Sequence, residues 1–261
     1  PIFLQNTGPQ SAINTVGLGF TSDQASTLTP RLEMVGAVTL AGGANTIRVN
    51  ANGALVVAQL SLGALVRAEQ ATAVLLGSSM DDPVAARRGD ILVRDGANLL
   101  AGLVGGGGVA GSASVSILPW AVGTNAGAAV TGSLFGNTFV TYSGLSKAFR
   151  ALTAAEYEQL SPSGGISPQN NVRYSGATDL TLTGVGHTLN ALLVENTSTT
   201  NALTLQGAGA ADSLSLNSGA LLFTGSTTAQ GIILGGFGAG IANPRGEYLI
   251  CLLYTSDAAD D

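Results

Sequence analysis

Short runs of β-favouring residues recur along the chain, and glycine or asparagine residues separate them. Most of these runs span only three to five residues before a turn signal interrupts them. Many short strands separated by turns are typical of an all-β fold in which single strands stack repeatedly. The clearest runs lie at 37–40, 46–49, 55–57, 91–93, 138–142, 180–182 and 221–223.

One internal repeat indicates the number of residues between equivalent positions of successive coils. The heptapeptide LTLTGVG at 180–186 recurs as LTLQGAG at 203–209, an offset of 23 residues, and the same offset maps 192–194 onto 215–217. A β-solenoid requires such a period, because each strand stacks on the equivalent strand of the next coil and inward aliphatic side chains form a ladder. The sequence therefore predicts an all-β protein whose architecture is a right-handed parallel β-helix, or β-solenoid.

A β-sandwich or jelly roll is the alternative. Sandwich strands usually run longer and pair across two-residue turns such as Asn-Gly. Asn52-Gly53 is the only Asn-Gly dipeptide here, and only 5% of the residues are aromatic. A narrow solenoid interior suits small aliphatic side chains, with glycine or asparagine at corners of positive φ. These features favour the solenoid.

Two segments interrupt the pattern within a solenoid predicted to span 1–250. Residues 96–172 are expected to form an irregular excursion, because no charged residue occurs from Gly96 to Ser146 and four glycines stand at 105–108. Glycine-rich sequence does not order itself, so we expect this segment to pack against or cover the solenoid. Thr153 and Glu156 have the spacing of a capping box, which predicts a short helix near 154–160.

The last eleven residues differ abruptly in composition. Residues 251–261, CLLYTSDAADD, contain the only cysteine and three aspartates among the final five positions. The string resembles the translation of a transposase-type sequencing adapter, which implies a native part of 1–250 cut at both ends and no redox role for Cys251. The alternative is an ordinary acidic C-terminal tail. We expect a strand to run a few residues past Ile250 and then an exposed tail.

Charge and hydropathy exclude several classes. Ten basic residues stand against sixteen acidic ones, giving a net charge of −6, and Lys147 is the only lysine. A nucleic-acid partner is not expected, because such proteins carry clustered Lys and Arg that neutralise phosphates. No apolar run approaches the roughly 20 residues of a transmembrane helix, so no transmembrane segment is predicted.

The densest charged stretch is the one place where an enzymatic hypothesis arises. Asp81, Asp82, Asp90 and Asp95 lie close to Arg88 in sequence. Some β-helices degrade polysaccharides, and glycoside hydrolysis uses two carboxylates about 5–10 Å apart. Neighbouring side chains on a strand or turn point apart, however, and no aromatic residue for stacking a sugar lies nearby. We predict a solvated loop whose charges balance locally.

Other candidate motifs are weaker. His187 follows a glycine in a predicted turn, and one imidazole without cysteine, a second histidine or a nearby carboxylate makes neither a metal site nor a catalytic triad. It is predicted to be a solvated turn residue. The tripeptide Arg88-Gly89-Asp90 has an integrin-type sequence but directly precedes a predicted strand.

Two glycine-rich stretches lack the residues of the ligand-binding motifs that they resemble. The glycines at 105–108 lack the Lys-Ser/Thr of a phosphate loop and are predicted to form a flexible loop. The stretch at 235–240 has Gly240 where a calcium-binding nonapeptide needs aspartate. Trp120 and Tyr142 could contact a glycan, although core packing is the commoner use of isolated aromatics. The sequence assigns no catalytic, cofactor-binding or metal residue.

Four ordered motifs carry a family resemblance: SILPWAVG at 116–123, FVTY at 139–142, the stretch 150–157, and SGALLF at 218–223. With these motifs the chain resembles large surface proteins that carry autotransporter-associated β-strand repeats. The resemblance implies a secreted or outer-membrane-displayed right-handed β-helix with no cofactor and no established enzymatic activity. The tandem glycine-rich unit of that family is present only as a degenerate trace at 180–186 and 203–209.

The expected function follows from this resemblance and from the lack of a catalytic constellation. We expect a non-catalytic structural or adhesive segment of a large autotransporter-like β-helix protein, extracellular or on the outer-membrane surface of a Gram-negative-type bacterium. An extracellular glycan or another surface ligand is the class of partner that this role allows. The alternatives are a polysaccharide-degrading β-helix enzyme and a phage tail-spike-like module, which would be trimeric.

Overall fold

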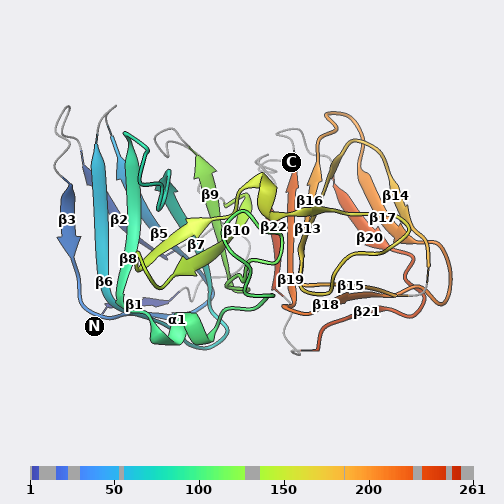
Figure 1. Cartoon of the computed structure of the whole chain (residues 1–261), viewed down its shortest axis with the longest axis horizontal. Coiled ribbons are helices and arrows are strands. Elements are labelled where there is room, and N and C mark those ends of the chain that lie inside the picture. The colour runs from blue at the N-terminus through green and yellow to red at the C-terminus, as the bar shows by residue number, and fades with distance from the viewer. Residues whose placement is uncertain are drawn as a thin grey trace, which may run out of the picture. The chain divides into compact units, whose positions relative to one another are not determined.

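The computed structural model describes residues 2–5, 16–22, 30–52, 56–126, 136–184, 186–225, 231–244 and 249–253. Its regular structure is almost entirely β, and the strands form a parallel β-solenoid of about seven turns (Figure 1). The predicted all-β solenoid class is therefore confirmed. The chain divides into two compact units, residues 1–103 with 120–152 and residues 104–119 with 153–261.

The first unit consists of two rows of parallel strands. One row contains β2 (Val16–Ser22), β5 (Ala44–Ala51), β7 (Thr72–Ser78) and β9 (Ala121–Ala126), paired in that order. In the other row, β6 pairs with β3, β4 and β8, and β4 pairs with β1. These strands are β1 (Ile2–Gln5), β3 (Arg31–Met34), β4 (Val38–Gly42), β6 (Val57–Arg67) and β8 (Arg88–Asp95).

An antiparallel hairpin closes this unit. Its strands, β10 (Thr138–Ser143) and β11 (Ala148–Ala151), pair antiparallel with β9 and β8 respectively. The hairpin therefore covers strand edges that would otherwise be open to other chains. The predicted excursion 96–172 is thus more regular than expected, because it contains β9 to β11 and the short helix α1 (Ala97–Ala101).

The second unit has three rows of parallel strands. The first row is β12 (Glu158–Gln159), β13 (Asn171–Gly176), β16 (Ala191–Asn196), β19 (Ala220–Gly225) and β22 (Leu249–Leu253). The second row is β14 (Leu180–Leu182), β17 (Leu203–Gly207) and β20 (Ile232–Gly235). The third row is β15 (His187–Leu189), β18 (Leu214–Leu216) and β21 (Ile241–Ala242).

The register of these rows corrects the predicted period. The two copies of the heptapeptide do stack, as β14 on β17, but Leu180 lies opposite Leu205, 25 residues away. Strand β16 stacks on β19 with an offset of 29 residues, Leu192 opposite Leu221, and not on 215–217. A shift of two residues keeps every side chain on its own face of a strand, so the repeat persists although its spacing is wrong.

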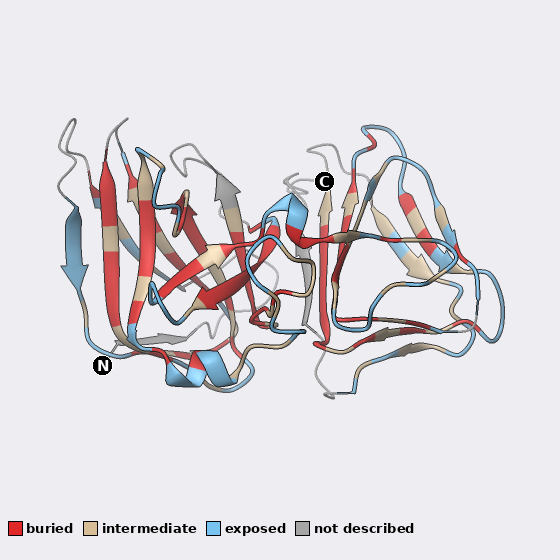
Figure 2. Cartoon of the chain, viewed as in Figure 1, coloured by how far each residue is buried: buried red, intermediate tan, exposed pale blue. Residues whose placement is uncertain are grey.

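Buried residues recur along the strands of both units (Figure 2), and most of them are aliphatic. In the second unit Leu192 lies opposite Leu221 and Val194 opposite Phe223, all within one buried cluster. In the first unit Leu60 lies opposite Ile91, and both are almost completely buried. Each such leucine or isoleucine contributes about 2 kcal/mol of burial free energy.

The uncharged segment 104–119 packs on the second unit, as expected for a segment that covers the solenoid. Its Val104 and Ile117 form an antiparallel bridge. The Asn171 side-chain amide donates to the Val115 carbonyl oxygen at 2.9 Å, and that of Asn190 donates to the Val104 carbonyl oxygen at 3.1 Å. Buried asparagines from two successive coils therefore fix the segment in place.

The predicted capping box forms, but the helix is shorter than predicted. A carboxylate oxygen of Glu156 accepts hydrogen bonds from the Thr153 N–H at 2.8 Å and the Thr153 hydroxyl at 3.2 Å. The element is a single 3₁₀ turn, Ala154–Glu156, and not a helix over 154–160. Pairing explains the difference, because residues 158–159 align with β13 as strand β12. Tertiary pairing here overrides a local helix signal.

The predicted continuation past Ile250 is also observed. Strand β22 runs from Leu249 to Leu253 and pairs with β19. The expected exposed tail falls on 254–261, which lie outside the described residues.

We predict that Gly77→Ala destabilises the first unit. A Cβ at Gly77 would clash with the carbonyl oxygen of Gly89 and with the side chain of Met80, because β7 and β8 approach closely there. Overpacking of this kind costs about 1–3 kcal/mol. Chemical denaturation followed by far-UV circular dichroism measures the loss. Gly19→Ala in β2 is the control, because nothing lies within 4 Å of its Cβ position; equal stability of the two variants would contradict the prediction.

Candidate functional site

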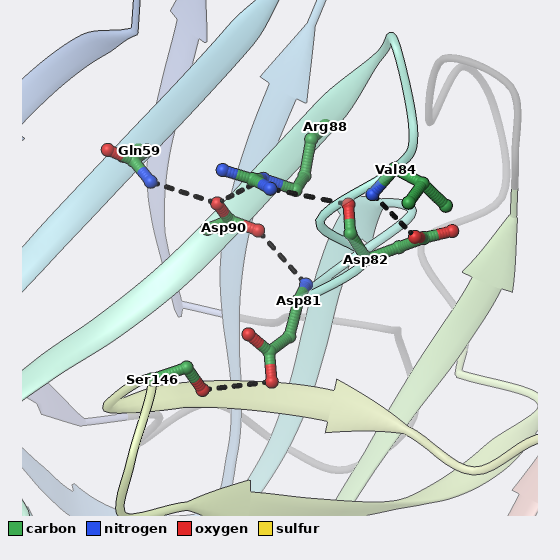
Figure 3. Close-up of polar contacts among 7 residues, drawn as sticks. All are labelled: Gln59, Asp81, Asp82, Val84, Arg88, Asp90 and Ser146. Carbon is green, nitrogen blue, oxygen red and sulfur yellow. Dashed lines mark hydrogen bonds and ion pairs between the residues drawn. The ribbon is translucent and has the colours of Figure 1, made fainter.

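The acidic cluster of the first unit is the candidate site. Residues 79–87 connect β7 to β8 and carry Asp81 and Asp82, while Asp90 lies within β8 and Asp95 at its end. Figure 3 shows the contacts of Asp90 with Gln59 of strand β6, of Asp81 with Ser146 in the β10–β11 hairpin, and of Asp82 within the loop.

Asp90 is the centre of the cluster. It is only 3% exposed, and its Oδ2 accepts a hydrogen bond from Gln59 Nε2 at 3.0 Å. The same oxygen forms an ion pair with Arg88 Nε at 2.7 Å. Its Oδ1 accepts the Asp81 N–H at 3.0 Å. Both carboxylate oxygens therefore have partners, as a buried charge requires, and they tie β6, β8 and the loop together.

Asp81 is half-buried and faces another way. Its Oδ2 accepts the Ser146 hydroxyl at 2.9 Å, so its carboxyl points to the hairpin turn and away from that of Asp90 (Figure 3). Burial chiefly raises the pKa of Asp81, and the negative charge of Asp90 raises it further. The hydrogen bond from Ser146 and the guanidinium groups of Arg150 and Arg88 act against this rise in pKa.

Asp82 and Asp95 are exposed. Asp82 Oδ1 accepts the Val84 N–H at 3.1 Å, which closes a local turn on the far side of the loop (Figure 3). The carboxylates of Asp81, Asp82 and Asp90 therefore point in three directions. Such an arrangement fastens a loop, but it does not place an acid and a base on either side of a common glycosidic bond.

The predicted solvated loop is correct for Asp82. Asp95 is solvated but ends strand β8, and the prediction is wrong for Asp90, which is buried within β8. Arg88 and Asp90 are two residues apart on a strand, so they share the face opposite Ile91 and Val93. Parallel register places Gln59 directly beside Asp90 on this face. The spacing of Arg88 and Asp90 could have indicated the ion pair, whereas the partner from β6 required the register.

The Arg88-Gly89-Asp90 tripeptide lies inside β8 rather than before a strand. Gly89 and Asp90 are buried, and Arg88 is paired with Asp90. An integrin-type contact needs the arginine and aspartate on an exposed loop, so this tripeptide is not presented for binding.

The prediction for His187 is wrong. His187 is the first residue of β15, is 5% exposed and lies opposite Leu214 in the next coil. Its Nε2 is buried without a hydrogen-bond partner. The residue points inward because Leu189, two positions later, shares its face of the strand. This alternation was visible in the sequence, but the preceding glycine suggested a turn.

The glycines at 105–108 form an irregular loop, as predicted, and the N–H groups of three of them are hydrogen-bonded. The N–H groups of Gly106 and Gly108 donate to the Ser114 carbonyl oxygen at 3.0 and 3.2 Å, and that of Gly107 donates to Ser116 Oγ at 3.0 Å. The segment returns on itself, and its own chain satisfies these donors.

The two aromatic candidates are buried, as core residues are. Trp120 is 9% exposed, with the Arg67 guanidinium 6.0 Å from its ring centroid. Tyr142 is 4% exposed, and its hydroxyl donates to the Val93 carbonyl oxygen at 2.9 Å. Neither forms an open platform for a sugar. Across the described residues, no group of three or more His, Cys, Asp or Glu side chains could hold a metal ion.

Comparison with known proteins identifies no relative of this chain. No family model matches the chain, and neither a curated protein nor a solved structure matches it. Within the described part of the chain, no helix is both long enough and apolar enough to cross a membrane. The function must therefore be argued from the geometry of the chain and from its sequence.

We predict that Asp81→Asn stabilises the protein at neutral pH. Because folding raises the pKa of Asp81, the protonated side chain contributes favourably to the free energy of unfolding at acidic pH. This contribution is lost as the pH rises through the folded-state pKa. Asparagine still accepts a hydrogen bond from Ser146, carries no charge beside Asp90 and tolerates the φ of 56° at this position. The gain in unfolding free energy should be below about 1 kcal/mol, since the group is partly solvated.

Thermal unfolding at several pH values measures this gain, which should shrink as the pH falls towards about 4. Asp82→Asn is the matched control, because Asp82 is exposed and an asparagine retains its local turn. A lower stability of Asp81→Asn at pH 7 would contradict the prediction.

We also predict that His187→Leu is more stable than the natural chain. The substitution removes a buried nitrogen without a partner and continues the aliphatic column of Leu214, so the gain should be about 1 kcal/mol. His187→Ala serves as the comparison, because it removes the ring without filling its space and should be destabilising. Denaturant unfolding distinguishes the two, and a destabilised leucine variant would show that the imidazole has an unrecognised partner.

Proposed function

We propose that the chain is a non-catalytic structural or adhesive segment of a larger autotransporter-like β-helix protein, secreted or displayed on a bacterial surface. The observation that carries this proposal is the use of the acidic cluster: Asp90 is fully engaged in holding β6, β8 and the loop together. The neighbouring carboxylates of Asp81 and Asp82 turn away from it. A site that acts on a sugar needs carboxylates that converge on it.

The outward faces of the second unit support an adhesive role. Thr181 and Gln206 are exposed neighbours in the row of β14 and β17, joined by a hydrogen bond of 3.2 Å. Thr188 and Ser215 lie side by side in the row of β15 and β18. These uncharged hydroxyl and amide groups suit a neutral, hydroxyl-rich partner such as an extracellular glycan, and they offer nothing that neutralises phosphate.

Localisation is part of the same proposal. The resemblance of 116–123, 139–142, 150–157 and 218–223 to autotransporter-associated repeat proteins supports an extracellular or outer-membrane site in a Gram-negative-type bacterium. Proteolytic shaving of intact cells that produce the parent protein tests it. Loss of the chain from the cells under conditions that spare cytoplasmic proteins is the expected result, and full protection would contradict it.

One observation favours the second candidate, a polysaccharide-degrading enzyme. The raised pKa of Asp81, a half-buried carboxyl beside another acid, is a property shared by catalytic acids. A polysaccharide lyase or hydrolase would use Asp81 to donate a proton.

A tail-spike-like module is distinguished by its trimeric state in solution, which light scattering measures.

We predict that the purified chain releases no reducing ends or unsaturated sugars from a panel of neutral and acidic polysaccharides. Retardation in gels containing one of the neutral polysaccharides is the expected sign of adhesion. Asp81→Asn is the decisive variant, because it should remain folded. Release of sugar by the natural chain that disappears in Asp81→Asn would establish the enzyme and overturn the proposal.

A further inference from the structure

The loop between β7 and β8 holds a peptide bond with unusual chemistry. Of the eight prolines in the chain, only Pro83 follows an aspartate. Asp82, Pro83 and Val84 are all exposed. An aspartyl-prolyl bond is a tertiary amide next to a carboxyl group, and its proline nitrogen is a better leaving group than an ordinary backbone nitrogen.

The carbonyl oxygen of Asp82 accepts two hydrogen bonds. The Ala85 N–H donates to it at 3.2 Å, which closes a turn over residues 82–85. Arg88 Nη1 donates to it at 3.3 Å (Figure 3). Two donors on one carbonyl oxygen, one of them a cation, are the arrangement that stabilises the negative charge formed when a carbonyl carbon is attacked.

The side chain of Asp82 is held beside the same bond. Its Oδ1 accepts the Val84 N–H at 3.1 Å, and the ring closed by this hydrogen bond contains the bond between Asp82 and Pro83. The other carboxyl oxygen, Oδ2, can form a five-membered ring with the carbonyl carbon of the same residue. A nucleophile fixed in this way has a high effective concentration.

We propose that the Asp82–Pro83 bond is a self-cleavage site that the fold activates in mildly acidic solution. The side-chain carboxyl oxygen of Asp82 forms a bond to the backbone carbonyl carbon of the same residue, while the bond from that carbon to the Pro83 nitrogen breaks. The carboxyl proton passes to the proline nitrogen, which leaves as an amine. The resulting cyclic anhydride is opened by one water molecule, so that Asp82 ends with two carboxyl groups and Pro83 becomes a new N-terminus.

Acid is needed because the carboxyl group supplies the proton that the nitrogen accepts. The charged residues next to Asp82 along the chain are Asp81, Arg87 and Arg88, and Arg88 Nη1 donates to its carbonyl oxygen. Asp90 and Arg150 act on the adjacent Asp81 carboxyl. The Asp81 carboxyl points to Ser146, so it does not compete for the bond. The rate should therefore rise as the solution becomes more acidic.

Cleavage should not separate the two pieces. Strand β7, on one side of the cut, pairs with β5 and β9. Strand β8, on the other side, pairs with β6 and β11. The product is a nicked solenoid whose fragments, 1–82 and 83–261, stay together until it is denatured.

The experiment incubates the purified whole chain at about pH 4 and pH 7 and follows its intact mass with time. The same chain unfolded in urea at about pH 4 gives the intrinsic rate of the bond. We expect the folded chain to be cleaved at least about tenfold faster than the unfolded chain, and faster at the lower pH. The two fragment masses should sum to the intact mass plus one water, and native size-exclusion chromatography should still give a single species.

Four variants test the assignment. Asp82→Glu enlarges the ring that must close, and Pro83→Ala restores an ordinary amide, so each should slow cleavage by more than about tenfold. Arg88→Lys removes the guanidinium from the carbonyl oxygen and should slow cleavage by about tenfold. Asp81→Asn, the matched control on the adjacent carboxyl, should leave the rate within about twofold. Circular dichroism of each variant confirms folding before the rates are compared.

Equal rates in the folded and unfolded chains would overturn the activation by the fold. Cleavage of Asp82→Glu at the natural rate, or fragments from another position, would overturn the assignment of the bond. Separation of the fragments on the native column would overturn the nicked product.

Discussion

Backbone hydrogen bonding between successive coils is the interaction on which the rest of the molecule depends. Each interior strand of the parallel rows donates to and accepts from the strands before and after it, as β16 does between β13 and β19. Direct register places equivalent side chains on the same face, so inward leucines stack on leucines and polar residues stack outside. The interior can therefore be narrow and almost purely aliphatic.

The narrow interior limits which side chains fit between neighbouring strands. Where β7 and β8 approach, Gly77 faces the Gly89 carbonyl oxygen, and no side chain fits between them. A parallel stack also leaves unpaired edges at its ends. The β10–β11 hairpin pairs with β9 and β8 in the first unit. In the second unit, Asn171 and Asn190 bind the uncharged segment 104–119.

The acidic cluster follows from the same geometry. Strand register brings Gln59 beside Asp90, and the ion pair with Arg88 completes a buried polar contact that fastens the loop after β7. In the loop itself, the Asp82 carbonyl oxygen accepts hydrogen bonds from the Ala85 N–H and from Arg88 Nη1. The strand register and the hydrogen bonds of the loop thus explain why the carboxylates of Asp81, Asp82 and Asp90 do not converge on one point.

The sequence alone determined the class of fold, because short β-favouring runs, small aliphatic residues and a stacked repeat allow few other solutions. It also determined the capping box at Thr153 and Glu156, since both partners are local. The tertiary structure decided the period, because turn length varies and the 29-residue repeat of Ala191–Asn196 on Ala220–Gly225 was hidden behind a shorter local match. It likewise decided the burial of Asp90, whose partner Gln59 comes from another coil and is set by register, which no local pattern specifies.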